Sequence, residues 1–134
     1  MPILRRTNQP VPETVGEVVR CIYESLSLKY RKTAESIQEI IGKKIRTINV
    51  VGGGTKDRFL SQMTADACGM NVIAGPEEAT AIGNLMMQAI AAGAVKDLAH
   101  ARSIVAASFD VKTYVPSKER APWDEAYERF LALN

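Results

Sequence analysis

Apolar residues recur at helical spacing along the first third of the chain. Between Val15 and Ile41 they fall mostly three or four positions apart, as on one face of an α-helix. Thr14 and Glu17 fit a capping box at the start of this segment, and Gly42 can supply the left-handed residue that ends it. We therefore predict one long helix after an irregular lead-in over residues 1–10. Its apolar stripe comprises Val15, Val18, Val19, Ile22, Leu26, Tyr30, Ile37, Ile40 and Ile41.

Two short runs rich in β-branched residues predict strands. Residues 45–51 end in an apolar pair and suit a strand buried on both faces of a parallel sheet, and residues 71–74 form a second strand. Three glycines break the first strand, and we predict that Thr55 caps a helix that ends at Gly69.

Further helices complete the pattern. One begins at Glu77-Glu78 and stops at Gly93, a second runs from a cap at Asp97 to about residue 107, and a third begins at Pro122. Residues 114–116 are predicted to form an extended turn. The helix that begins at Glu77-Glu78 should turn inward Ala79, Ile82, Met86, Ala89 and Ile90.

This alternation predicts an α/β fold with right-handed crossovers, built from two parallel strands and several helices. Two strands make a poor sheet, because three or more are normally needed for independent stability. We therefore expect either that the missing strands lie upstream in a longer protein or that a second copy of the chain covers the exposed faces.

Composition narrows the class of protein. Apolar residues make up 46% and charged residues 24% of the chain, which predicts a single globular domain rather than a disordered tail. A net charge of +2 gives no electrostatic reason to expect nucleic acid or a membrane as partner, and no apolar run approaches the roughly 20 residues that span a bilayer. Residues 1–6 lack the apolar core of a signal peptide. We expect a cytoplasmic protein in which Cys21 and Cys68 are reduced and buried.

The glycine run is the most informative local signal. Gly52, Gly53 and Gly54 follow a strand, at the end where open α/β sheets bind ligands, and they would let a flat ligand come close to the main chain. A tight turn without any ligand explains the run about as well. The dinucleotide fingerprint fails, because position 57 is Asp57 rather than glycine, and the phosphate-binding P-loop fails because Gly42-Lys43-Lys44 precedes a strand.

Individual polar residues favour structural roles. Lys56, Asp57 and Arg58 follow the glycine run and could contact a ligand, although solvated charges at a helix start are the commoner explanation. Asp66 is expected to cap or hydrogen-bond a neighbouring backbone, and His100 to lie at or near the surface. Gly83 lies inside a helix and suggests a close approach of another element. The residues alone indicate a chain that binds a ligand at a glycine loop and performs no chemistry by itself.

Four segments together resemble the FGGY family of carbohydrate kinases: residues 13–26, 48–56, 60–69 and 72–84. A long helix, the glycine loop INVVGGGTK, an A-D-x-x-G helix end and a G-P-x-E-A-T helix start follow one another at the family's spacing. The likeness runs from about residue 9 to about residue 116. The last of the four segments resembles in particular the branch of the family that phosphorylates L-rhamnulose.

The resemblance implies that residues 1–134 form the C-terminal lobe, actin-like and ribonuclease-H-like, incomplete at its N-terminal side. In such kinases a preceding lobe carries the sugar site and an aspartate base, and Mg-ATP donates the phosphoryl group. Gly52, Gly53 and Gly54 would line the adenosine pocket, and Arg58 would face the adenine. The phosphate loops, the base and the sugar-binding residues have no counterpart here, so we expect about the last quarter of an enzyme, inactive alone and without a metal site.

Two alternatives remain open at the level of sequence. One is a non-catalytic interaction module that retains the fold of the lobe, and the other is a kinase of the same family that acts on another ketose or polyol. The partners implied are ATP and ADP, a sugar bound through the missing lobe, and further copies of the chain associated through exposed apolar faces.

Overall fold

The long helix begins and ends where the sequence predicts. The computed structural model describes residues 4–5 and 9–133 of the chain, and α2 spans Val15–Ile41. The Thr14 hydroxyl accepts a hydrogen bond from the Glu17 N–H (3.2 Å), and the Glu17 carboxylate accepts one from the Thr14 N–H (3.0 Å), which confirms the capping box. Gly42 ends the helix in the left-handed conformation.

The irregular lead-in is confirmed only in part. Residues 1–3 and 6–8 lie outside the described residues, residues 9 and 10 have no regular structure, and Leu4 and Arg5 are helical.

The sheet contains three strands among the described residues, rather than the two that the sequence predicts. Strands β1 (Thr47–Val50) and β2 (Asn71–Ala74) run parallel, and β3 (Lys112–Tyr114) pairs with β2 in the antiparallel direction. Residue 114 therefore belongs to a strand and not to the turn predicted over residues 114–116. The order β1-β2-β3 makes β2 the central strand, and its Val72 is fully buried. The α/β class is confirmed, and the third strand supplies part of the missing sheet.

A short 3₁₀ turn, η1 (Gly52–Lys56), separates β1 from α3 (Arg58–Cys68). Asp57 caps α3, because its carboxylate accepts a hydrogen bond from the Leu60 N–H at 2.9 Å. The prediction that Thr55 caps this helix is wrong: its hydroxyl donates to the Gly52 carbonyl inside the turn (2.8 Å). Gly69 ends α3 in the left-handed conformation, as predicted.

Helix α2 packs against α3 with a face other than its apolar stripe. The buried residues of α2 are Ser27, Leu28 and Ala34, and small side chains there let the two helices approach closely. Eight of the nine side chains in the stripe are exposed; Val15 is 81% and Ile40 is 84% exposed. Within the described residues, the apolar stripe is therefore a surface that has no partner.

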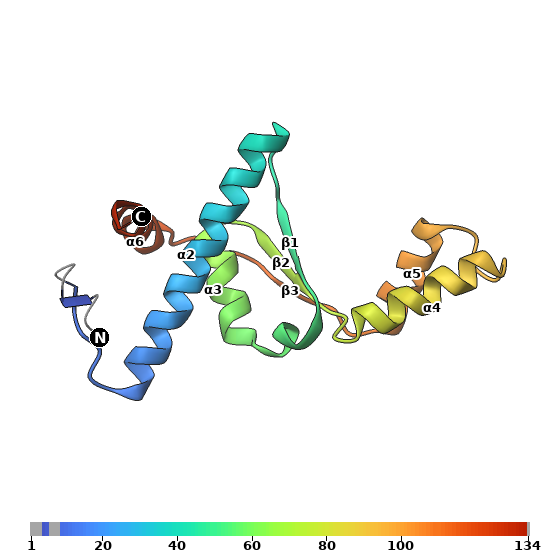
Figure 1. The fold of residues 1–134 in the computed structure, drawn as a ribbon, viewed down its shortest axis with the longest axis horizontal. Coiled ribbons are helices and arrows are strands. Elements are labelled where there is room, and N and C mark those ends of the chain that lie inside the picture. Colours follow the sequence, from blue (N-terminus) through green and yellow to red (C-terminus); the bar gives the residue numbers. More distant parts are fainter. Residues whose placement is uncertain (1–3, 6–8, 134) are drawn as a thin grey trace.

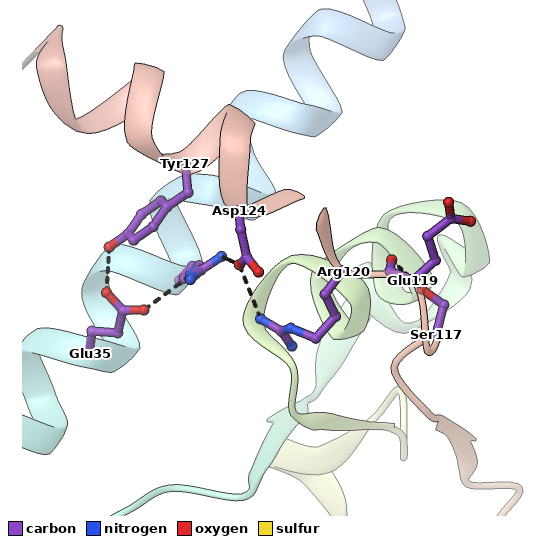
Figure 2. Close-up of polar contacts among 7 residues, drawn as sticks. Glu35, Ser117, Glu119, Arg120, Asp124 and Tyr127 are labelled. Atoms are coloured by element: carbon purple, nitrogen blue, oxygen red, sulfur yellow. Dashed lines mark hydrogen bonds and ion pairs between the residues drawn. The ribbon is translucent and has the colours of Figure 1, made fainter. Parts of the chain in front are cut away.

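The C-terminal helix α6 (Ala121–Ala132) packs against α2 and α3, and Figure 1 shows it beside α2. Its Tyr127 is buried with Leu28 and Ala67. Arg31 of α2 donates to Asp124 at 2.7 Å and lies 4.1 Å from the centre of the Tyr127 ring, and the Tyr127 hydroxyl donates to Glu35 at 2.6 Å (Figure 2). These contacts attach α6 to the middle of α2.

Helices α4 (Ala79–Ala91) and α5 (Leu98–Ser108) pack together beyond the end of the sheet (Figure 1). The predicted inward face of α4 is confirmed: Ile82 is buried and the other four residues are half-buried. Gly83 makes no close approach, because a Cβ atom added there would meet nothing within 4 Å. None of the described helices is both long and apolar enough to cross a membrane.

Candidate functional site

The glycine turn leaves the main chain open beside the carboxyl end of β1. Gly52 has a φ of +79°, a conformation that other residues adopt at a cost, and a Cβ atom added at Gly53 would meet nothing within 4 Å. Gly54 is closer to its surroundings, with the Val50 Cγ1 atom 3.6 Å from an added Cβ. A flat ligand could therefore approach the backbone at Gly53 most directly.

Helix α2 holds the end of the glycine turn. The Tyr23 hydroxyl donates a hydrogen bond to the carboxylate of Asp57, the residue that caps α3. The backbone hydrogen bond from Leu60, and after it the hydrogen bond from Tyr23, lower the pKa of Asp57. The hydrogen bond that Tyr23 donates to Asp57 raises the pKa of Tyr23. Asp57 is thus an ionised structural anchor, and two elements fix the residue that follows the turn.

A cavity of about 400 Å³ lies where the connections at the strand ends meet. Three segments line it: the end of η1 and start of α3, the connection from β2 to α4, and the connection from α5 to β3. The lining residues are Thr55, Lys56, Arg58, Ala74, Gly75, Pro76, Glu77, Phe109, Asp110 and Lys112. Of the four predicted site residues, Arg58 lines this cavity, and Gly52, Gly53 and Gly54 precede Thr55 without lining it.

The lining carries an excess of positive charge, with three basic and two acidic side chains. The Lys56 ammonium lies 2.6 Å from a Glu77 carboxylate oxygen, and this hydrogen bond raises the pKa of Lys56. The contact joins η1 to the residues before α4. Arg58 and Lys112 form no ion pair within the part of the chain that the structure describes, so their charges remain available to an anionic group.

Two other hollows lie away from the carboxyl ends of the parallel strands. One, also of about 400 Å³, is lined by Glu35, Gln38 and Lys44 at the opposite end of β1, and another of about 770 Å³ lies between Pro12 and Arg129. Because open α/β sheets bind ligands at the carboxyl ends of their strands, we place the candidate site in the cavity beside the glycine turn.

The remaining polar candidates have structural roles. Asp66 accepts hydrogen bonds from the Gln62 side chain (2.9 Å) and the Ser117 N–H (2.7 Å), which confirms its expected role. His100 is exposed, as expected, and accepts a hydrogen bond from the Lys96 N–H. Both cysteines are free, but only Cys68 is buried; Cys21 is half-buried, contrary to expectation. Among the described residues, no group of three or more His, Cys, Asp or Glu side chains could hold a metal ion.

The sequence of the chain matches a known family of enzymes. Residues 2–92 match the C-terminal domain of the FGGY family of carbohydrate kinases, and the chain belongs to this family.

Several curated relatives of the chain are rhamnulokinases. The chain is 48% identical to the rhamnulokinase of Bacteroides thetaiotaomicron over 126 residues, which cover 94% of this chain and 26% of that protein. It is 43% identical to the rhamnulokinase of Enterococcus faecalis (95% and 26% covered) and 46% identical to that of Bacillus subtilis (84% and 23%). The chain thus spans about a quarter of the length of the curated relatives that it matches.

A solved structure supports the fold. The xylulose kinase of Rhodospirillum rubrum superposes with a TM-score of 0.70 at 26% identity, over 92% of this chain and 25% of that one. The predicted resemblance to the FGGY family is confirmed. The roles of Gly52, Gly53, Gly54 and Arg58, and the assignment of residues 1–134 to one lobe, stay predictions.

Proposed function

We propose that this chain supplies the adenosine-binding part of an ATP-dependent kinase that converts L-rhamnulose to L-rhamnulose 1-phosphate. The observation that carries the proposal is the open main chain of Gly53 at the carboxyl end of β1, beside a positively charged cavity. The names of the rhamnulokinase relatives support the choice of sugar. With ATP as the phosphoryl donor, we assign the activity to the cytoplasm.

In the proposed reaction a carboxylate accepts the proton of the sugar hydroxyl, the oxygen bonds to the γ-phosphorus, and ADP leaves. We assign neither this base nor the sugar site to the present chain, because Asp57 and Asp66 are engaged in structural hydrogen bonds. The Mg²⁺ ion that accompanies ATP would be held by the phosphates and by residues outside this chain. The chain alone would bind nucleotide weakly and transfer no phosphate.

Nucleotide titration tests this proposal. Without a phosphate clamp, we expect the 134-residue chain to bind adenosine no more tightly than about 1 mM, or roughly −4 kcal/mol. The Gly53→Ala variant should weaken binding several-fold, because the added methyl group fits the free protein but occupies the path of the ligand. Gly16→Ala is the matched control, since its methyl group also meets open space, in α2. Micromolar affinity with ATP hydrolysis would contradict the weak, inactive chain that we propose.

The sugar requires a separate experiment. In the full-length polypeptide that contains this chain, we expect phosphorylation of L-rhamnulose to exceed that of D-xylulose. The structural similarity to a xylulose kinase makes another ketose the alternative substrate. A higher kcat/KM with D-xylulose would favour that alternative and leave the nucleotide-binding role intact.

A second role, as an interaction module, rests on a different observation. The apolar stripe of α2 is exposed, and β1 is an edge strand of the described sheet, so the described residues present two unpartnered surfaces. We propose that copies of the isolated chain associate through the stripe. Sedimentation velocity should show oligomers that Ile22→Glu and Ile37→Glu dissociate. A monomer that unfolds cooperatively at all concentrations would contradict this role.

A further inference from the structure

We propose that Phe109 presents an aromatic face to the adenine ring, on a wall of the cavity formed by residues 109–112. The inference rests on the proposed nucleotide-binding function and extends it to a segment outside the matched FGGY domain, which ends at residue 92. Among the described residues that line the cavity, Phe109 is the one aromatic side chain. Phe109 is 43% exposed, so its side chain is accessible from solvent.

Two elements hold this wall in place. The Phe109 N–H donates to the Val105 carbonyl at the end of α5 (3.1 Å), and Lys112 pairs with Ala74 across β3 and β2. The wall also packs tightly on the connection after β2, because a Cβ atom added at Gly75 would lie 2.8 Å from the Asp110 carbonyl oxygen. Hydrogen-bonded backbone therefore lies both before Phe109, in α5, and after it, in β3, and the two elements fix its position.

The wall shares the cavity with Arg58, the residue expected to face the adenine. Thr55 and Lys56 at the end of η1, together with Arg58 at the start of α3, bound the cavity on one side, and the wall bounds it between α5 and β3. A planar ring that enters this cavity beside Arg58 would thus meet the Phe109 side chain. Stacking of a base on an aromatic side chain is worth roughly 1–3 kcal/mol by alanine substitution, or about 5- to 150-fold in affinity.

The experiment measures adenosine affinity by NMR titration of the 134-residue chain. We expect Phe109→Ala to weaken binding at least about fivefold and Phe109→Tyr to restore it, because tyrosine keeps the aromatic face. Leu131→Ala on α6 is the matched control: Leu131 has the same exposed fraction, 43%, and does not line the cavity. It should bind adenosine as the unmodified chain does.

The outcomes separate the inference from the function on which it rests. If the unmodified chain binds adenosine and Phe109→Ala binds it equally well, the role of Phe109 is wrong and the proposed function stands. If the unmodified chain does not bind adenosine at tens of millimolar, both are wrong. If Phe109→Ala fails to fold, Phe109→Leu decides: it keeps the apolar bulk, so unchanged affinity overturns the inference and a fivefold loss supports it.

Discussion

Tyr23, in the first half of α2, donates a hydrogen bond to Asp57, the residue that caps α3 directly after the glycine turn. The bond crosses 34 positions of sequence and joins the longest helix to the candidate site. Since Asp57 also accepts from the Leu60 N–H, one carboxylate fixes both the start of α3 and its distance from α2. The position of Arg58, the next residue, depends on this arrangement.

Replacement of Tyr23 by phenylalanine should lower the free energy of unfolding at neutral pH. The Asp57 carboxylate would lose the hydrogen bond from Tyr23, and its pKa, now held below the ordinary value, should rise. A depressed pKa contributes stability that is present above the unfolded value and lost as the pH falls through the folded one. The difference between the variant and the unmodified chain, measured by urea unfolding, should therefore shrink in acid.

Tyr30→Phe serves as the control for this prediction. Tyr30 lies on the same helix, and no hydrogen bond of its hydroxyl is found among the described residues. Equal stability losses in the two variants at pH 7 would contradict a specific role for the bond between Tyr23 and Asp57.

The attachment of α6 should weaken in alkaline solution. Burial, and then the hydrogen bond to Glu35, raise the pKa of Tyr127 to about 12. A raised pKa contributes stability that is complete below the unfolded value near 10 and lost as the pH rises through the folded value. We expect the free energy of unfolding to fall between about pH 10 and pH 12. Phenolate absorbance at 295 nm monitors the ionisation of tyrosine over the same range. The loss of stability in alkaline solution should be smaller in the Tyr127→Phe variant. The same pH dependence of stability in the variant and the unmodified chain would contradict the role of Tyr127.

Gly69→Ala should destabilise the chain by about 1–2 kcal/mol, the cost of a left-handed conformation for a residue with a side chain. Gly69 has a φ of +64°, and its added methyl group would collide with the Arg120 guanidinium, which can move aside. Gly16→Ala places the same methyl group in the open, on a helix, and should stabilise by up to about 1 kcal/mol. Urea denaturation of the two variants tests the opposite signs; a loss of the same size in both would count against the left-handed cap.

The two thiols should differ in reactivity. Burial raises the pKa of Cys68 to about 11, whereas Cys21 is half-buried on α2. Because the thiolate is the reactive form, iodoacetamide at pH 8 should label Cys21 in the native chain and Cys68 only after unfolding. Mass spectrometry of the labelled peptides reads both sites in one sample, and Cys21→Ser should remove the native labelling. Rapid labelling of Cys68 in the folded chain would be inconsistent with its burial.

The ends of the helices could be predicted from the sequence, because helix caps depend on contacts between residues that are close in the chain. Thr14 with Glu17, and the glycines at positions 42 and 69, satisfy backbone groups by contacts within a few residues, so their patterns carry the necessary information. Asp57 was missed as a cap because the three glycines form an additional 3₁₀ turn, which delays the start of α3 by two residues. Aspartate is a residue type that commonly caps helices, so Asp57 itself was the signal for the later start of α3.

Contacts between distant segments could not be read in the same way. Strand β3 has three residues, too few for an alternating pattern to appear, and it exists because β2 pairs with it. The face that α2 buries was also hidden, because Ser27 and Ala34 matter for close packing rather than for hydrophobicity. In the candidate site, the glycine run was evident, but Phe109 is more than fifty positions away and only the fold brings it to the cavity.

The attachment of α6 also has a consequence for the order of folding. Arg31 and Asp124 are separated by 93 positions and Glu35 and Tyr127 by 92, so these contacts close a loop that includes the entire sheet. The entropy cost of closing a loop grows with its length, and contacts between distant residues slow folding. We expect α2, α3 and β2 to assemble early and α6 to dock in a late kinetic step. The C-terminal helix would then stabilise a core that has already folded.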